Sequence, residues 1–256
     1  MTEPTTVPAL EVRGIRIDYG SRGVLSDVSF AVAGGEAVAL IGPNGAGKTS
    51  LLRAITGLLR PRAGEVLVDG NPLASIERAA LARLVAVVPG QTVVAFPMRV
   101  EELVALGRVP HEHPLLGLRP VDHERIAAAM ARVGITALCD RDVRELSLGE
   151  RQLAVLAMAI AQDARILLLD EPTVHLDLRH QVRVMELLRD LAARDGVTIL
   201  AVLHDIALAR LFFDRLLLLD GGRLVADGTP AEVLTASTIS TVYGVDPHLV
   251  LGGLPG

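Results

Sequence analysis

The stretch that decides the fold runs from Val38 to Thr49 and reads V-A-L-I-G-P-N-G-A-G-K-T. Its first four residues are apolar, which is typical of a short buried strand, and helical periodicity follows from Thr49 to Leu59. A glycine-rich loop that ends in Lys-Thr between a buried strand and a helix is the pattern of a phosphate-binding loop. The stretch therefore predicts an α/β protein that binds the phosphates of a nucleotide.

Each residue type in this loop has a physical task. Glycines let backbone N–H groups wrap the β- and γ-phosphates, and the N-terminus of the following helix favours an anion. Lys48 reaches the terminal phosphates, and the hydroxyl of Thr49 can bind Mg²⁺. The alternative is a glycine-rich turn that only connects strand and helix, but Lys48 is the single lysine of the chain and falls on the motif's lysine. The candidate ATP-binding residues are Gly42, Pro43, Asn44, Gly45, Ala46, Gly47, Lys48, Thr49 and Ser50.

The composition excludes several classes of protein. The chain has 256 residues, half of them apolar, so it can bury a large core as one domain. Its single cysteine, Cys139, excludes internal disulfides and cysteine metal sites, and we expect this thiol to be buried. A net charge of −5 without a basic block argues against nucleic acid as a partner. No apolar run approaches the roughly 20 residues of a membrane-spanning helix, and residues 1–9 lack the features of a signal peptide.

Periodicity divides the chain into strands and helices. Strands alternate with helices before about Gly90 and after Gly149, which implies a mostly parallel sheet core, while the opening segments alternate like a half-buried antiparallel sheet. Only helical patterns occur between these two glycines, which predicts a helical insertion. The expected strands are residues 10–19, 28–32, 38–41, 65–68, 84–88, 166–169, 197–203, 216–219 and 223–226. The expected helices are residues 49–59, 100–106, 123–133, a segment near 140, 151–161, 179–194, 206–213 and 230–234.

Three polar side chains follow buried strands. Asp170 and Glu171 close an apolar strand, at the sheet edge where open α/β sheets bind ligands. Asp170 suits a contact to Mg²⁺, and Glu171 can polarise the water that attacks the γ-phosphate. His204 also follows a strand, and an adjacent parallel strand would bring it to the same edge, near the γ-phosphate. The alternatives are an acidic strand end without a ligand and an ordinary structural histidine.

Together with these residues, the stretch Leu146-Ser147-Leu148-Gly149-Glu150-Arg151-Gln152 resembles the ABC transporter ATPase family, whose signature reads L-S-G-G-x-x-Q. The resemblance covers essentially the whole chain. It implies a single domain with the RecA-like α/β fold of P-loop NTPases. Residues 1–90 and 163–256 would form the nucleotide-binding core with an N-terminal antiparallel β subdomain, and residues 91–162 a helical subdomain that carries the signature.

The resemblance also implies roles for single residues. Tyr19 matches the aromatic residue that stacks on adenine, and Asp177 in T-V-H-L-D matches the loop that contacts a second subunit. Two chains would pair head-to-tail, so that Ser147 and Gly149 of one chain face the γ-phosphate of ATP bound to the other. Glu171 would act as the base in hydrolysis while Mg²⁺ neutralises charge. The implied cofactors are ATP and Mg²⁺, and the implied assembly is a homodimer.

Two positions depart from the family pattern. Leu148 stands where the family has its first signature glycine, and leucine there would cost about 1 kcal/mol or more, and could weaken closure of the dimer, if the position required a positive φ or a close approach to phosphate. Gly90 follows a proline where the family usually has glutamine, so Gln91 comes one position late. Gln91 is then the candidate for touching Mg²⁺ or water and the membrane partner. The alternative is an ordinary polar loop residue.

Two further patterns have plain structural explanations. Ser147 and Glu150 form S-x-x-E, a capping box for the next helix, and this is compatible with an anion site at the same helix start. His111 and His113 bracket a glutamate in a Pro-flanked loop, and a solvated loop is the better explanation than a metal site because no further ligand lies at metal-binding spacing.

Residues 95–111 and 242–245 are similar to family members that energise the uptake of iron–siderophore, haem or vitamin B12. This similarity implies an ATP-hydrolysing importer subunit at the cytoplasmic face of the cell membrane. Its implied partners are a separate transmembrane permease and, indirectly, a solute-binding protein. Relatives in DNA repair would carry a long coiled coil, and translation factors two cassettes, and neither feature occurs. A nucleotide-binding regulator with weak or no hydrolysis stays open because of Gly90 and Leu148.

Overall fold

A computed structural model describes residues 7–90, 96–113 and 115–247. The described residues form two compact units, one within the ranges 1–75 and 200–256 and the other within 76–199. The predicted helical subdomain at residues 91–162 has different boundaries from either unit, and that division stays a prediction. Across the described residues, every helix is too short or too polar to span a bilayer.

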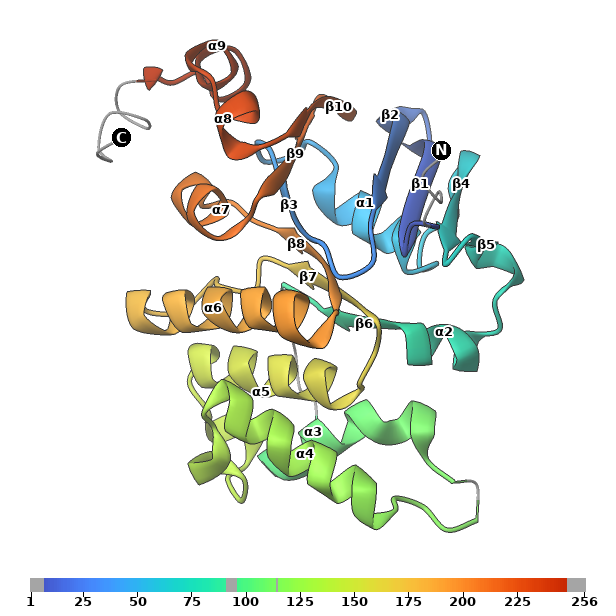
Figure 1. Cartoon of the computed structure of the whole chain (residues 1–256), viewed down its shortest axis with the longest axis vertical. Helices are drawn as coiled ribbons and strands as arrows, with labels where there is room; N and C mark the ends of the chain where they lie inside the picture. Colours follow the sequence, from blue (N-terminus) through green and yellow to red (C-terminus); the bar gives the residue numbers. More distant parts are fainter. Residues whose placement is uncertain (1–6, 91–95, 114, 248–256) are drawn as a thin grey trace, which may run out of the picture. The chain divides into compact units, whose positions relative to one another are not determined.

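The described elements follow one another in α/β order (Figure 1). The strands are β1 (Leu10–Tyr19), β2 (Arg22–Val32), β3 (Ala37–Ile41), β4 (Ala63–Val68), β5 (Asn71–Pro72), β6 (Val85–Val88), β7 (Ile166–Asp170), β8 (Thr198–Val202), β9 (Arg215–Asp220) and β10 (Arg223–Gly228). The α-helices are α1 (Lys48–Ile55), α2 (Arg78–Leu84), α3 (Val100–Ala105), α4 (Pro120–Val133), α5 (Leu148–Ala161), α6 (Leu178–Asp195), α7 (Ile206–Phe212), α8 (Pro230–Val233) and α9 (Ala236–Thr238). The other helical turns are η1 (Leu73–Ser75), η2 (Leu106–His111), η3 (Thr136–Leu138), η4 (Val143–Glu145) and the π-helix η5 (Ile239–Tyr243).

The first unit contains the antiparallel sheet that the opening alternation predicted. Strand β1 pairs antiparallel with β2 and with β4, in the order β2-β1-β4-β5, as Figure 1 shows. The same unit holds β3 in parallel register with β9, and β10 closes a hairpin on β9. Leu40 and Leu217, opposite each other in the parallel pair, are fully buried, as expected for strands covered on both faces.

The second unit is mainly helical around a parallel pair of strands. β6 and β7 pair in register from Val85↔Ile166 to Val88↔Leu169. Helices α3, α4 and α5 pack against one another, which confirms that the predicted insertion is mainly helical from Val100 onward (Figure 1). The α/β fold class predicted from the strand and helix pattern is thus confirmed.

A buried ion pair fixes η2 against α4 and α5. Arg108 donates from Nε and Nη2 to Asp122 Oδ1 at 3.0 and 2.8 Å, and from Nη1 to the carbonyl oxygen of Ala161 at 2.8 Å. The backbone N–H of Arg119 and the guanidinium of Arg108 lower the pKa of Asp122 to about 2. A buried carboxylate that is fully hydrogen-bonded in this way holds its helix start firmly in place.

Several local predictions were wrong. Helix α1 ends at Ile55, short of the predicted Leu59, because Gly57 takes a φ of 71° and Leu58 is 79% exposed. Helix α2 was missed, since it buries none of its side chains and so has no strong apolar face. The segment near residue 140 forms the 3₁₀ turns η3 and η4 rather than an α-helix.

Two side chains also differ from expectation. Cys139 is only partly buried, because it caps a turn where its Sγ lies 3.5 Å from Asp140 Oδ2. His111 ends η2 instead of lying in a solvated loop, and its Nε2 lies 2.8 Å from the carbonyl oxygen of Gln162. His113 is exposed, as expected.

Candidate functional site

The predicted phosphate loop leads from β3 into the N-terminus of α1. Gly42, Gly45 and Gly47 have φ of 144°, 80° and 106°, a region that favours glycine. A Cβ at Gly42 would lie 2.0 Å from the carbonyl oxygen of Leu219, and one at Gly47 would lie 2.5 Å from Leu25 Cδ2. Within the first unit, the fold therefore demands glycine at two of these positions for steric reasons, before any ligand is considered.

The single lysine lies inside this loop. Lys48 is 5% exposed, and its Nζ donates to the carbonyl oxygens of Gly42 at 2.7 Å and Pro43 at 3.0 Å. Helix α1 begins after Gly47 without a side-chain cap. The loop thus combines a buried positive charge with a helix N-terminus that side chains leave uncovered, which are the two components of an anion site.

Tyr19 and His204 belong to the same unit as the phosphate loop. Tyr19 ends β1 at the hairpin to β2, opposite Arg22, and is 45% exposed, so its ring is accessible for stacking. His204 is exposed in the turn after β8, directly before Asp205, which caps α7 by accepting hydrogen bonds from two backbone N–H groups. His204 therefore follows its strand as predicted.

Asp170 and Glu171 lie at the carboxyl end of β7, in the second unit. Glu171 has a φ of 53° and His175 a φ of 70°, and non-glycine residues adopt such values rarely, at a cost of about 1–3 kcal/mol each. Backbone hydrogen bonds from Val174 to Glu171 and from Leu176 to Thr173, both 3.2 Å, hold the turn. Backbone strain that begins at the second of two carboxylates is a feature of functional sites, because the surrounding structure must enforce it.

Gly90 approaches the backbone of Asp170 closely. A Cβ at position 90 would lie 3.0 Å from the carbonyl oxygen of Asp170 and 3.7 Å from its Cγ. A larger residue than glycine would therefore crowd Asp170, so Gly90 has a steric reason as well as the loop flexibility that glycine gives. Gln91, the candidate for Mg²⁺ or water, lies outside the described residues.

The predicted capping box at the start of α5 is confirmed. Ser147 Oγ accepts from the backbone N–H of Glu150 at 3.2 Å, and Glu150 Oε2 accepts from the backbone N–H of Ser147 at 2.9 Å. The bond from the Ser147 backbone N–H and, second, one of 2.8 Å that the Ser147 hydroxyl donates to Glu150 Oε2 lower the pKa of Glu150. Leu148 is the first residue of α5, and its φ is not positive. The backbone strain that a positive φ would impose on leucine is therefore absent.

The structure brings Ser147, Gly149 and Asp177 together around one cavity of about 470 Å³. A Cβ at Gly149 would lie 3.1 Å from the carbonyl oxygen of His175, so the start of α5 packs tightly on the loop that ends in Asp177. Asp177 caps α6 by accepting from the backbone N–H of His180 at 2.9 Å. Two segments that are far apart in sequence thus form one surface within the second unit.

Sequence reasoning missed His180 at this cavity. Its Nδ1 lies 2.8 Å from Asp177 Oδ1, and its backbone N–H and then its ring lower the pKa of Asp177. An aspartate followed three residues later by a side-chain donor is the helix-start spacing that could have revealed the pair.

Comparison with known proteins decides the family. The model of the family described as ABC transporter matches residues 25–174, which is more than half of the chain. The chain belongs to the ABC transporter family. Its cassette is also similar to the dimeric structure of a bacterial ABC transporter cassette, with 25% identity, a TM-score of 0.78 and coverage of 86% of this chain and 98% of that one.

Three named relatives refine the position of this cassette within the family. The hemin import ATP-binding protein HmuV of Nocardia farcinica is 46% identical over 94% of this chain and 86% of its own. The ferric enterobactin transport ATP-binding protein FepC of Escherichia coli is 38% identical over 96% and 90%. The cobalamin import ATP-binding protein BtuD of Halobacterium salinarum is 41% identical over 96% of this chain, which spans only 61% of that relative's length.

Proposed function

We propose that this cassette is the ATP-hydrolysing motor subunit of an importer, which energises uptake of an iron–siderophore, haem or cobalamin-like solute through a separate membrane permease. The observation that carries the proposal is the phosphate loop, because its glycine conformations, its buried Lys48 and its uncapped helix start form a site for a polyphosphate. The nucleotide-binding core at residues 1–90 and 163–256, with the helical subdomain at 91–162, is the domain arrangement we propose.

The nucleotide would be held by side chains of the phosphate loop and by Tyr19. Lys48 would contact the terminal phosphates, and Tyr19, with 45% of its surface exposed, would stack on the base. Thr49 is an exposed residue, and its hydroxyl and the carboxylate of Asp170 are each an oxygen ligand of the kind that Mg²⁺ prefers, so each residue by itself suits that ion. Bound Mg²⁺ would neutralise charge that develops on the phosphates.

Hydrolysis would depend on three further residues. We assign Glu171 as the general base that polarises water, because the strained turn fixes its position directly after Asp170. His204 would contact the γ-phosphate, and Gln91 would touch Mg²⁺ or water. In a homodimer, Ser147, Gly149 and Asp177 would contact the second copy, and the cavity that they share is the surface we propose for this contact.

The solute class follows from the relatives' names, which refer to hemin, ferric enterobactin and cobalamin. All three are large organic metal complexes, and the chain covers most of the first two relatives. On this basis we propose membrane permease subunits as direct partners, a solute-binding protein as an indirect one, and a location at the cytoplasmic face of the cell membrane. Nucleic acid is not proposed as a partner, given the net charge of −5.

The alternative, a nucleotide-binding regulator that hydrolyses ATP weakly or not at all, rested on Gly90 and Leu148. Leu148 has no positive φ, which removes the backbone argument for a disabled signature. Gly90 is the remaining departure from the family pattern, and it lies close to the backbone of Asp170, a residue that we assign to Mg²⁺. The regulator therefore stays the alternative that measurement of ATP hydrolysis has to test.

Phosphate release by the purified chain with Mg-ATP tests the motor function, with Glu171→Gln beside Glu186→Gln, an exposed glutamate on α6. We expect wild type and Glu186→Gln to hydrolyse ATP at similar rates. We expect Glu171→Gln to lose at least about a hundredfold in rate and to form an ATP-bound dimer, followed by light scattering. Wild type that binds ATP without turnover, even in the presence of its permease, would favour the regulator.

Reconstitution with the permease in liposomes tests the solute class. Uptake of hemin, a ferric siderophore and cobalamin is measured with and without ATP inside the liposomes. ATP-dependent uptake of one of these solutes is the expected result. ATP hydrolysis that is stimulated by the permease without uptake of any of the three would retain the motor and reject the solute class.

A further inference from the structure

A second cavity, of about 360 Å³, lies in the second unit at the start of β7, away from Asp170 and Glu171. Leu167 lines it, and Asp170 lies three residues further along the strand, about 10 Å away at the usual rise of a strand. The volume lies at the lower end of the range of about 300–1,000 Å³ that is typical of small-molecule sites. The residues that we assign to ATP do not line this cavity.

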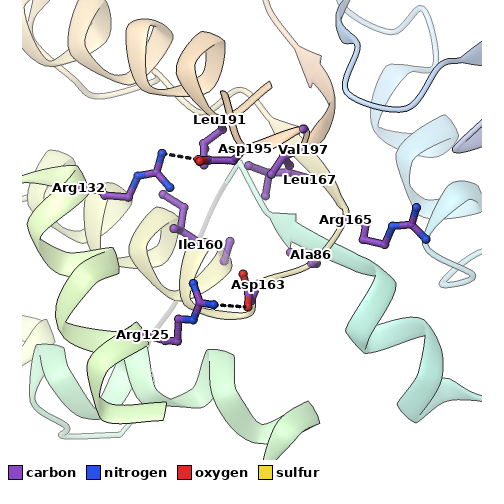
Figure 2. Close-up of a pocket in the computed structure, with 13 residues that line it drawn as sticks. Ala86, Arg125, Arg132, Ile160, Asp163, Arg165, Leu167, Leu191, Asp195 and Val197 are labelled. Atoms are coloured by element: carbon purple, nitrogen blue, oxygen red, sulfur yellow. Dashed lines mark hydrogen bonds and ion pairs between the residues drawn. The ribbon is translucent and has the colours of Figure 1, made fainter. Parts of the chain in front are cut away.

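The walls of this cavity are charged and its floor is apolar. Figure 2 shows Arg125 and Arg132 pointing from α4 across the cavity, each toward an aspartate. The floor includes Leu167 and Leu191, both buried, and Figure 2 shows Ile160 between the two ion pairs. An apolar floor with a few convergent polar groups is the usual composition of a site for a small organic ligand.

The guanidinium groups of Arg125 and Arg132 differ in how well the neighbouring aspartates satisfy their hydrogen-bond donors. Arg132 Nη2 donates to Asp195 Oδ2 at 2.6 Å, which is a short, charge-assisted hydrogen bond. Arg125 Nη2 lies 3.6 Å from Asp163 Oδ2, beyond hydrogen-bond distance, and the guanidinium of Arg125 makes no hydrogen bond to a protein group within the described ranges. A guanidinium has five N–H donors, so Arg125 has most of its capacity available to a ligand.

We infer that this cavity binds a small amphipathic anion, with its carboxylate, sulfonate or phosphate head on Arg125 and its apolar body on the floor formed by Leu167 and Leu191. Figure 2 shows Arg165, the third arginine of the lining, pointing away from the two ion pairs, so the preference for an anion depends on the guanidinium of Arg125. Such a ligand would contact α4, the start of β7 and the end of α6 at once, and would therefore stiffen their packing.

The charge of the ligand's head group distinguishes a binding role of Arg125 from a purely structural role of its ion pair. If Arg125 only tied α4 to Asp163, its loss would lower the stability of the fold and leave ligand affinity unchanged. If it holds an anion, its replacement by a neutral residue weakens an anionic ligand and leaves a neutral ligand of the same shape unaffected. The test therefore compares two probes that differ in one group.

The probes are 8-anilinonaphthalene-1-sulfonate and its uncharged analogue N-phenyl-1-naphthylamine, titrated by fluorescence into the full chain in saturating Mg-ADP. We expect one saturable site for the sulfonate and about tenfold weaker binding of the analogue. Arg125→Gln should lower the affinity for the sulfonate about tenfold. Arg132→Gln should lower it about threefold, because the guanidinium of Arg132 already donates to Asp195. Ala164→Leu, which fills the cavity without changing charge, should abolish binding of both probes.

The matched control is Arg194→Gln, since Arg194 is 77% exposed on α6 and does not line the cavity. It should bind the sulfonate like wild type, and melting by circular dichroism should show that every variant is folded. Equal affinity of wild type, Arg125→Gln and Ala164→Leu for the sulfonate would overturn the inference. Equal affinity of wild type for the two probes would overturn the assignment of an anion, and so would complete displacement of the sulfonate by Mg-ADP.

Discussion

The start of α1 and the start of α5 carry the two glycine-containing motifs of this cassette, and they are built in opposite ways. Helix α1 has no side-chain cap, and steric contacts demand glycine before it, above all at Gly42. Helix α5 is capped reciprocally by Ser147 and Glu150, and a leucine takes its first position without a positive φ.

This difference separates a site built for a ligand from a helix start that is stable by itself. At α1 the N-cap residue is Gly47, which has no side chain to cap the helix, so a phosphate can take the place of a cap, and the conformation is enforced by residues without a Cβ. Around α5 the side chains stabilise the helix, so the sequence can vary at one position. The departure at Leu148 from the family pattern is therefore tolerated by the fold, whereas a departure at Gly42 would not be.

Gly42→Ala should break the first half of this comparison, with the largest effect. The new Cβ would lie 2.0 Å from the carbonyl oxygen of Leu219, and the φ of 144° belongs almost exclusively to glycine. Overpacking and backbone strain together should cost about 4 kcal/mol or more of the free energy of unfolding. Urea denaturation without nucleotide measures this cost.

Gly45→Ala is the matched control for that experiment. Gly45 also has a positive φ, 80°, but an added Cβ would meet no atom within 4 Å, so only conformational strain of about 1 kcal/mol is expected. Equal losses of stability in the two variants would show that strain, and not contact with Leu219, makes the loop specific for glycine.

Ser147→Ala should sharpen the second half of the comparison. Its hydroxyl accepts the backbone N–H of Glu150 at 3.2 Å, and loss of a cap of this kind costs about 1 kcal/mol. Ser147→Thr keeps the hydroxyl and should unfold close to wild type in the same urea titration. If Ser147→Ala were as stable as wild type, α5 would be held by packing alone, and the contrast with α1 would lose its basis.

The pH dependence of stability should show the same contrast at a smaller scale. Hydrogen bonds from Ser147 lower the pKa of Glu150 in the folded state, so its contribution is present above the unfolded value of about 4.3 and is lost as the pH falls through the folded pKa. Glu150→Gln can still accept the bond from Ser147 but cannot titrate.

Thermal unfolding of wild type and Glu150→Gln between about pH 7 and about pH 3 checks this prediction. The Tm of wild type should exceed that of Glu150→Gln near neutral pH, and the difference should close in acid. Asp122, whose pKa is lowered to about 2, titrates in both proteins and cancels from the comparison. A constant difference across the range would mean that the carboxylate charge of Glu150 contributes nothing to the capping box.

Motif spacing was sufficient to predict the capping box of α5 and the strand–loop–helix order around Lys48. Most strand positions were also predictable, because parallel strands such as β7 and β9 are continuous apolar runs. What the sequence could not provide was through-space contact. The approach of Gly90 to Asp170, the cavity shared by Gly149 and Asp177, and the ion pair of Arg108 all join segments whose separation in sequence carries no local signal.

Leu148→Gly should have the smallest effect, and its sign is informative. Leu148 is 56% exposed at the first position of α5, so little buried surface is lost, and a glycine at a helix end costs less than the 1 kcal/mol or so of a helix interior. We expect a loss of at most about 0.5 kcal/mol in urea denaturation. A gain in stability would instead reveal a strained leucine, because only relief of backbone strain could outweigh the entropy lost on ordering glycine. The starts of α1 and α5 would then be more alike than their capping indicates, because position 148 in the signature would also prefer glycine.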